Sequence, residues 1–127
     1  MVEVVTAIIK DDNGKILICK NSNIENQNEL WKLPCGKIEI GETDEEAITR
    51  GVKQDLNIEI SVSNYITEKS FEYPEKTINM IVYDAKYEYG KPTDDTGHKW
   101  IKETEFDKYN FGPTDKYIIN QLNKEIE

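Results

Sequence analysis

The sequence lacks the features of membrane-spanning, secreted and zinc-binding proteins. Its 127 residues contain no apolar run of about 18 residues, which excludes a transmembrane helix. The first six residues have neither the basic segment nor the apolar core of a secretion signal. Histidine occurs once, and Cys19 and Cys35 follow no zinc-binding spacing. We therefore expect two reduced thiols, rather than a disulfide, in a cytoplasmic protein that does not bind a membrane.

Positive charge is also scarce. The chain has 16 Lys and Arg against 25 Asp and Glu, which gives a formal net charge of -9. This charge opposes binding to duplex nucleic acid, because such binding depends on cations that neutralise phosphates. A small phosphorylated ligand remains compatible with it, since a divalent cation can bridge acidic protein and anionic substrate. The length predicts one domain over residues 1–127.

Residue patterning predicts a layered α/β domain. Thr43 and Glu46 form a capping box, which predicts a helix over 44–56 that ends at Asn57. A second helix is predicted after Pro113. Apolar and β-branched stretches predict strands over 2–10, 15–20, 58–66, 68–73, 77–89 and 99–101, with a short strand near 31–33 that enters a turn at 34–37. Strands on both sides of a helix, with a helix at the end, favour a mixed sheet between helices.

The segment from Gly36 to Ile58 carries the most informative motif. It resembles the Nudix box, G-x5-E-x7-R-E-U-x-E-E-x-G-U with U apolar, and matches it at Gly36, Glu42, Arg50, Val52 and Ile58. The preceding sequence WKLPCGK is similar to the W-x-F/L-P-G-G-K entry of MutT-like members. The stretches 71–74, 99–101 and 111–115 resemble later landmarks of that subgroup, in the same order.

This resemblance covers essentially the whole chain. It implies the Nudix fold, which is an α/β/α sandwich with a central mixed sheet. It also implies a hydrolase that cleaves the phosphoanhydride of nucleoside triphosphates or other nucleoside-diphosphate-X compounds. Such chemistry requires neutralised phosphate oxygens and an activated water, which Mg²⁺ or Mn²⁺ held by carboxylates provides.

The resemblance assigns roles to individual residues. It implies catalytic roles for Glu42, Arg50, Gln54 and Asp55, with Arg50 bracing the box carboxylates. The alternative for Arg50 is a simple exposed ion pair with Glu42 or Glu46. The implied metal contacts are the backbone of Gly36 and the side chains of Glu42, Gln54 and Asp55, with Asp94 or Asp95 filling the gap left by Gly51.

Three further residues are implied to bind the substrate, namely Lys37, Tyr73 and Asp115. Asp115 aligns with a position that contacts the nucleobase in some MutT-like relatives, where a carboxylate accepts a hydrogen bond from an exocyclic amine. The alternative is that Asp115 is a charge in the first turn of a helix, favoured by the helix dipole. The aromatic residues Tyr73, Phe71 and Phe111 either stack on a base or belong to the core, and we expect His98 in an exposed loop.

The helix of the box departs from the family pattern. Gly51, Gln54 and Asp55 stand where the pattern has three glutamates, and Asn57 replaces its glycine. Positions 51, 54 and 55 share one helix face, so the predicted metal site loses about two formal negative charges. Glycine costs about 1 kcal/mol relative to alanine inside a helix. Gly51 therefore indicates either a ligand that has been given up or a close approach to another segment.

We expect from this departure that hydrolysis is weakened by several orders of magnitude. The alternative is a catalytically silent domain that binds a nucleotide or a protein partner.

Overall fold

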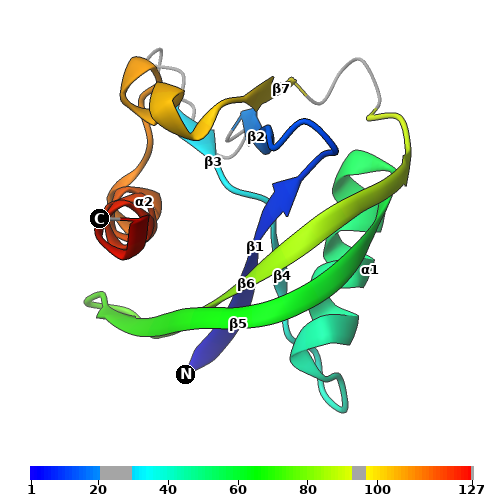
Figure 1. Cartoon of the computed structure of the whole chain (residues 1–127). Helices are drawn as coiled ribbons and strands as arrows, with labels where there is room; N and C mark the ends of the chain where they lie inside the picture. The colour runs from blue at the N-terminus through cyan, green and yellow to red at the C-terminus, as the bar shows by residue number, and fades with distance from the viewer. Residues whose placement is uncertain (21–29, 93–96, 127) are drawn as a thin grey trace.

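The computed structural model describes residues 1–20, 30–92 and 97–126, and these form three layers (Figure 1). Helix α1 (Asp44–Leu56) covers one face of a mixed sheet and helix α2 (Pro113–Ile126) covers the other, as Figure 1 shows. A 3-10 helix, η2 (Glu103–Lys108), precedes α2. The strands are β1 (Val2–Lys10), β2 (Ile16–Lys20), β3 (Trp31–Lys32), β4 (Cys35–Lys37), β5 (Ile58–Glu72), β6 (Thr77–Gly90) and β7 (His98–Ile101). The predicted α/β/α sandwich with a central mixed sheet is confirmed.

Strand β1 lies in the middle of this sheet. The strand order is β3-β2-β1-β6-β5, with β7 paired to β2. Strands β1 and β6 run parallel, from Val2 opposite Ile78 to Lys10 opposite Lys86. The other edge of β1 is shared, because β4 pairs with Val4 to Thr6 and β2 pairs with Lys10. The Ala7 N–H donates to the Pro34 carbonyl at 2.9 Å between these two pairings. The segment that enters the Nudix box is thereby held against the centre of the sheet.

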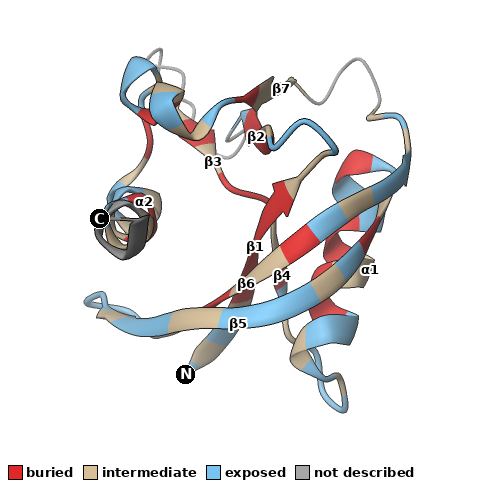
Figure 2. Ribbon diagram, in the orientation of Figure 1, coloured by how far each residue is buried: buried red, intermediate tan, exposed pale blue. Residues whose placement is uncertain are grey.

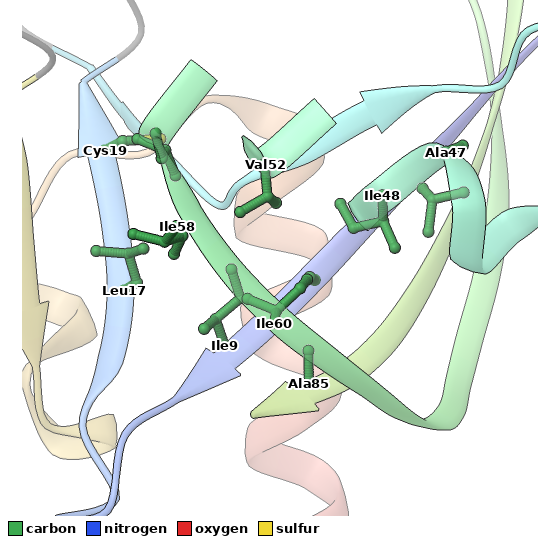
Figure 3. Close-up of a cluster of buried hydrophobic side chains, with 12 residues drawn as sticks. Ile9, Leu17, Cys19, Ala47, Ile48, Val52, Ile58, Ile60 and Ala85 are labelled. Atoms are coloured by element: carbon green, nitrogen blue, oxygen red, sulfur yellow. The ribbon is translucent and has the colours of Figure 1, made fainter. Parts of the chain in front are cut away.

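Two apolar clusters hold the layers together. Side chains of a strand alternate between faces, so Val5, Ala7 and Ile9 face α1, whereas Ile8 faces α2. Figure 3 shows Ile48 and Val52 of α1 in the same cluster as Ile9 of β1 and Leu17 of β2. Figure 2 shows that buried residues concentrate in β1, β2 and the inner face of α1. Within the described ranges, no helix is long and apolar enough to cross a membrane.

Helix α1 forms as predicted because its signals are local. The Thr43 hydroxyl accepts from the Glu46 N–H at 3.1 Å, and the Glu46 carboxylate accepts from the Thr43 N–H at 2.9 Å. The helix ends at Asn57, whose φ of 57° lies in the left-handed region. Its predicted apolar face, Ile48, Val52 and Leu56, is buried.

Other elements differ from the prediction in ways that tertiary packing explains. Residues 58–72 form one strand rather than two, because bulges between Glu59 and Thr67 let it bend without leaving β6. His98 is half-buried in β7, where it pairs with Cys19, and is not in an exposed loop. Pro113 is the first residue of α2, a position where its missing N–H costs nothing.

Cys19 and Cys35 are free thiols, as predicted.

Candidate functional site

Two facing glycines bring α1 against β4. A Cβ on Gly51 would lie 2.8 Å from Cα of Gly36 and 3.0 Å from the carbonyl oxygen of Cys35. A Cβ on Gly36 would collide with the carbonyl oxygen of Ala47. Both residues therefore have to be glycine for the helix and the strand to pack at this separation. Of the two explanations that the sequence left for Gly51, the structure shows the close approach.

Arg50 connects the helix to the loop that precedes it. Its guanidinium donates to both carboxylate oxygens of Glu42, through Nε at 2.7 Å and Nη2 at 2.9 Å. Nη2 also donates to the carbonyl of Lys37 at 2.7 Å, and Nη1 donates to Oε1 of Gln54 at 3.1 Å. Such a bidentate pair fixes orientation as well as distance. The predicted brace is thus present, and it holds the segment between Lys37 and Glu42 on α1.

The Glu42 carboxylate is engaged on both oxygens. Besides the two bonds from Arg50, its Oε1 accepts from the N–H of Glu39 at 2.8 Å. These bonds, above all those from Arg50, lower the pKa of Glu42, and the same contact raises the pKa of Arg50. Both groups therefore remain charged near neutral pH. Glu42 is placed to hold the loop and is a poor proton acceptor.

The described part of the box does not by itself complete a divalent-cation site. Gly51 offers no side chain, and the amide oxygen of Gln54 already accepts from Arg50. Asp55 is exposed at the end of α1. Over residues 1–20, 30–92 and 97–126, no three His, Cys, Asp or Glu side chains gather closely enough to hold a metal ion. The predicted ligands Asp94 and Asp95 lie outside the described residues.

Asp115 lies at the start of α2, against the entry to the box. Its Oδ1 accepts from the N–H of Leu33 at 3.3 Å, and the residue is half-buried. Burial raises the pKa of Asp115 to about 6, although the Leu33 N–H and Lys32 act in the opposite direction. At pH 7 the carboxylate is mostly ionised and able to accept a hydrogen bond.

The side chain of Cys35 is half-buried at the start of β4. Burial raises its pKa, the charge of Lys32 acts in the opposite direction, and the charges of Asp115 and Asp55 add smaller increases.

The other predicted substrate-binding residues, Lys37 and Tyr73, are exposed. Lys37 contributes its carbonyl to the Arg50 network while its side chain is exposed. Tyr73 is 44% exposed in the turn between β5 and β6, where its backbone bonds to Lys76. Phe71 packs edge-on against Tyr117 of α2, with the ring centroids 5.8 Å apart. No described contact joins Tyr73 to the Arg50 network.

One residue of this region was not found by sequence reasoning. Thr6 is 1% exposed, and its hydroxyl oxygen has no hydrogen-bond partner among the described residues. The β1–β4 register places Thr6 opposite Cys35. Threonine is an ordinary strand residue, so nothing in its sequence context could have singled it out.

In this protein a capped helix packs on the mixed sheet of an α/β/α sandwich, and an arginine of that helix holds the glycine-containing loop before it. This arrangement is the one found in the Nudix domain. A model of the NUDIX domain matches residues 4–121. The chain belongs to the Nudix family, in its MutT-like branch.

Relatives agree with this assignment over nearly the full length. The chain is 25% identical over 124 residues to an 8-oxo-dGTP diphosphatase of Haemophilus influenzae, covering 96% of this chain and 91% of the relative. It is 29% identical over 117 residues to a CTP pyrophosphohydrolase of Escherichia coli, covering 91% and 86%. The solution structure of the E. coli ORF135 protein superimposes with a TM-score of 0.85 at 25% identity, covering 98% of this chain and 89% of that one.

Proposed function

We propose that this chain binds nucleoside triphosphates or other nucleoside-diphosphate-X compounds and hydrolyses their phosphoanhydride slowly, with Mg²⁺ or Mn²⁺. The observation that carries this proposal is the complete Arg50 brace, which holds the loop from Lys37 to Glu42 on the helix that bears Asp55. A brace of this kind is needed to fix a phosphate-binding loop in place. The relatives named above support it, since their names describe nucleotide diphosphatases or pyrophosphohydrolases.

In this proposal individual residues bind the base, the phosphates and the metal ion. Asp115 accepts a hydrogen bond from the nucleobase, and the exposed ammonium of Lys37 contacts phosphate. A bound divalent cation would neutralise phosphate charge and activate a water. Asp94 and Asp95 are the residues that we propose to add carboxylates beside Asp55.

A catalytically silent, nucleotide-binding domain is the second candidate. Two observations favour it. The contact of Gly51 with β4 leaves no room for a carboxylate at that position without movement of α1. In addition, Arg50 occupies the polar oxygens of both Glu42 and Gln54.

Release of phosphate and pyrophosphate from a panel of nucleotides, with Mg²⁺ and with Mn²⁺, tests these proposals. The native protein is compared with Asp55→Asn, with the double variant Gln54→Glu/Asp55→Glu, and with a triple variant that adds Gly51→Glu. The double variant adds a carboxylate at position 54 and lengthens the one at position 55, both at exposed positions, and leaves Gly51 and its contact with β4 unchanged. Nucleotide binding is measured in parallel by calorimetry.

Each outcome supports or refutes one of the two candidate functions. Native turnover of about 1 s⁻¹ or faster would show that other residues fill the site. Slower native turnover that Asp55→Asn abolishes supports the impaired hydrolase. A silent native protein beside an active double or triple variant indicates a degenerate site on an intact scaffold. Binding without turnover in every variant supports the silent domain, and neither binding nor turnover refutes both candidates.

A further inference from the structure

A pocket of about 400 Å³ opens at the end of the sheet that carries the turn between β1 and β2. Because β1 and β6 run parallel and β7 pairs with β2, this turn, the end of β6 and β7 meet there (Figure 1). Such a volume is within the usual range for sites that bind small molecules. The lining includes Asp11, Tyr87, Lys91, Pro92, His98 and Trp100. None of these residues has a role in the proposed function, so the pocket is a separate candidate site.

Two aromatic rings form adjoining walls of this pocket. Trp100 of β7 and Tyr87 of β6 are half-buried against the apolar cluster that faces α1. Their ring centroids are 5.3 Å apart, and the angle between the ring planes is 68°. The Tyr87 hydroxyl donates to the carbonyl of Gly90, which fixes the direction of the tyrosine ring. The two walls therefore form a corner rather than a slot between parallel rings.

A corner of this kind suits a rounded ligand better than a flat one. A flat ring gains most by stacking on a parallel surface, whereas a tetrahedral group can touch both walls at once. The face of an aromatic ring also attracts cations, and tryptophan does so most strongly. The trimethylammonium group combines a rounded shape with a positive charge, and it is a ligand that cages of aromatic side chains bind.

The charges around the pocket also favour a cation. Asp11 is half-buried in the lining, and its Oδ1 accepts from the N–H groups of Asn13 and Lys15, each at 2.9 Å. These bonds hold the carboxylate in place without using Oδ2. The Lys91 carbonyl accepts from Nδ2 of Asn57 at 3.3 Å, which anchors the main chain, while the exposed lysine side chain can extend into solvent. The net charge of -9 adds a long-range attraction for cations.

We propose that this pocket binds a small quaternary ammonium ion, such as choline, between Trp100 and Tyr87, with the Asp11 carboxylate as its counter-charge. The methyl groups contact both rings, and cation–π attraction supplies the preference for a charged ligand over a neutral one of the same shape. The inference does not require that the chain binds a nucleotide, because the pocket shares no residue with the proposed nucleotide site.

NMR spectroscopy of the indole N–H groups tests this inference at the pocket itself. Choline is the probe, and its neutral carbon analogue, in which a tert-butyl group replaces trimethylammonium, is the matched control ligand. The chain has two tryptophans, of which Trp100 lines the pocket and Trp31 belongs to the cluster on the α2 side. Trp31 is therefore the internal reference, and Trp100→Phe assigns the two signals. Because His98 lines the pocket, titrations are made at pH 8, where histidine side chains are ordinarily neutral.

We expect choline to shift the Trp100 signal and to bind about tenfold more tightly than its neutral analogue. Tyr87→Leu should weaken choline binding about tenfold, whereas Tyr87→Phe should keep it because the ring remains. Asp11→Asn should weaken it about fivefold, although asparagine keeps the oxygen that accepts both N–H groups of the turn. The matched controls Tyr89→Leu and Asp12→Asn change exposed residues outside the lining and should leave the affinity unchanged.

Three results would overturn the cation site. They are equal binding of choline and its neutral analogue, no change in the Trp100 signal at tens of millimolar choline, and equal shifts of both indole signals. Unchanged affinity in Asp11→Asn overturns the counter-charge. If Tyr87→Leu does not fold, the comparison of the two ligands and the Asp11→Asn variant still decide the matter, because neither alters the apolar cluster.

A trimethylated lysine carries the same cation as choline on a different chain. Titration with the free amino acid Nε-trimethyl-lysine distinguishes these two sources of the ligand. Tighter binding of choline supports a free small molecule as the natural ligand, and tighter binding of Nε-trimethyl-lysine supports a methylated side chain. Either result supports the site, and weak binding of both that equals the neutral analogue overturns it.

Discussion

The contact between Gly51 and Gly36 leads to a prediction about stability. Gly51→Ala adds a methyl group that would lie 2.8 Å and 3.0 Å from backbone atoms, whereas ordinary van der Waals contacts are 3.4–4 Å. Because the opposing atoms belong to the backbone of β4, α1 has to shift. Overpacking of this kind costs about 1–3 kcal/mol. Alanine regains about 1 kcal/mol of helix propensity. We therefore expect the free energy of unfolding to fall, by up to about 2 kcal/mol.

Urea unfolding followed by tryptophan fluorescence measures this change. Glu45→Ala, at an exposed position in the first turn of the same helix, is the control and should alter the free energy of unfolding by less than about 0.5 kcal/mol. Gly51→Glu should be destabilised at least as much as Gly51→Ala. An increase of about 1 kcal/mol for Gly51→Ala would equal the full propensity gain and refute the close approach.

Three other substitutions test the site and its supports. Arg50→Lys should lower the melting temperature and expose the loop before α1 to proteolysis, because lysine cannot form the paired bonds to Glu42; an unchanged melting temperature would contradict the brace. The raised pKa of Asp115, about 6 against 3.8, means that the native protein loses stability as the pH rises through about 6. The free energy of unfolding of Asp115→Asn should therefore exceed that of the native protein by about 1–3 kcal/mol at pH 8, and this difference should shrink toward pH 4. A difference in unfolding free energy that stays constant with pH would argue against the raised pKa of Asp115. Thr43→Ala should cost about 1 kcal/mol in thermal unfolding followed by circular dichroism, since it removes the hydroxyl that caps α1, and no change would show that the cap is dispensable.

The parts of the fold that could be predicted from the sequence are those fixed by neighbours in the chain. The capping box of Thr43 and Glu46, the left-handed Asn57 and the apolar stripe of α1 all depend on residues within one or two turns. The brace between Arg50 and Glu42 was likewise expected from the resemblance to the Nudix box, because both residues lie in that continuous motif.

The parts that could not be predicted depend on the pairing of distant segments. The position of Thr6 opposite Cys35 follows from sheet register, which the sequence of β1 alone does not specify. A close approach at Gly51 was one of two explanations that the sequence offered, but its partner, a glycine 15 residues earlier on another element, could not be identified from the helix alone. The 3-10 helix η2 has no apolar periodicity long enough to be recognised.

The bulges in β5 have a consequence for association between molecules. Strand β5 is at the edge of the sheet, pairs along its length with β6, and is 15 residues long. A flat edge of that length would be a template for another strand. The register shifts near Ile60 and Tyr65 twist it out of plane, and exposed charged residues such as Glu68 and Lys69 line its outer half. The irregularity that lets β5 follow the curve of the sheet also protects the edge from strand-to-strand aggregation.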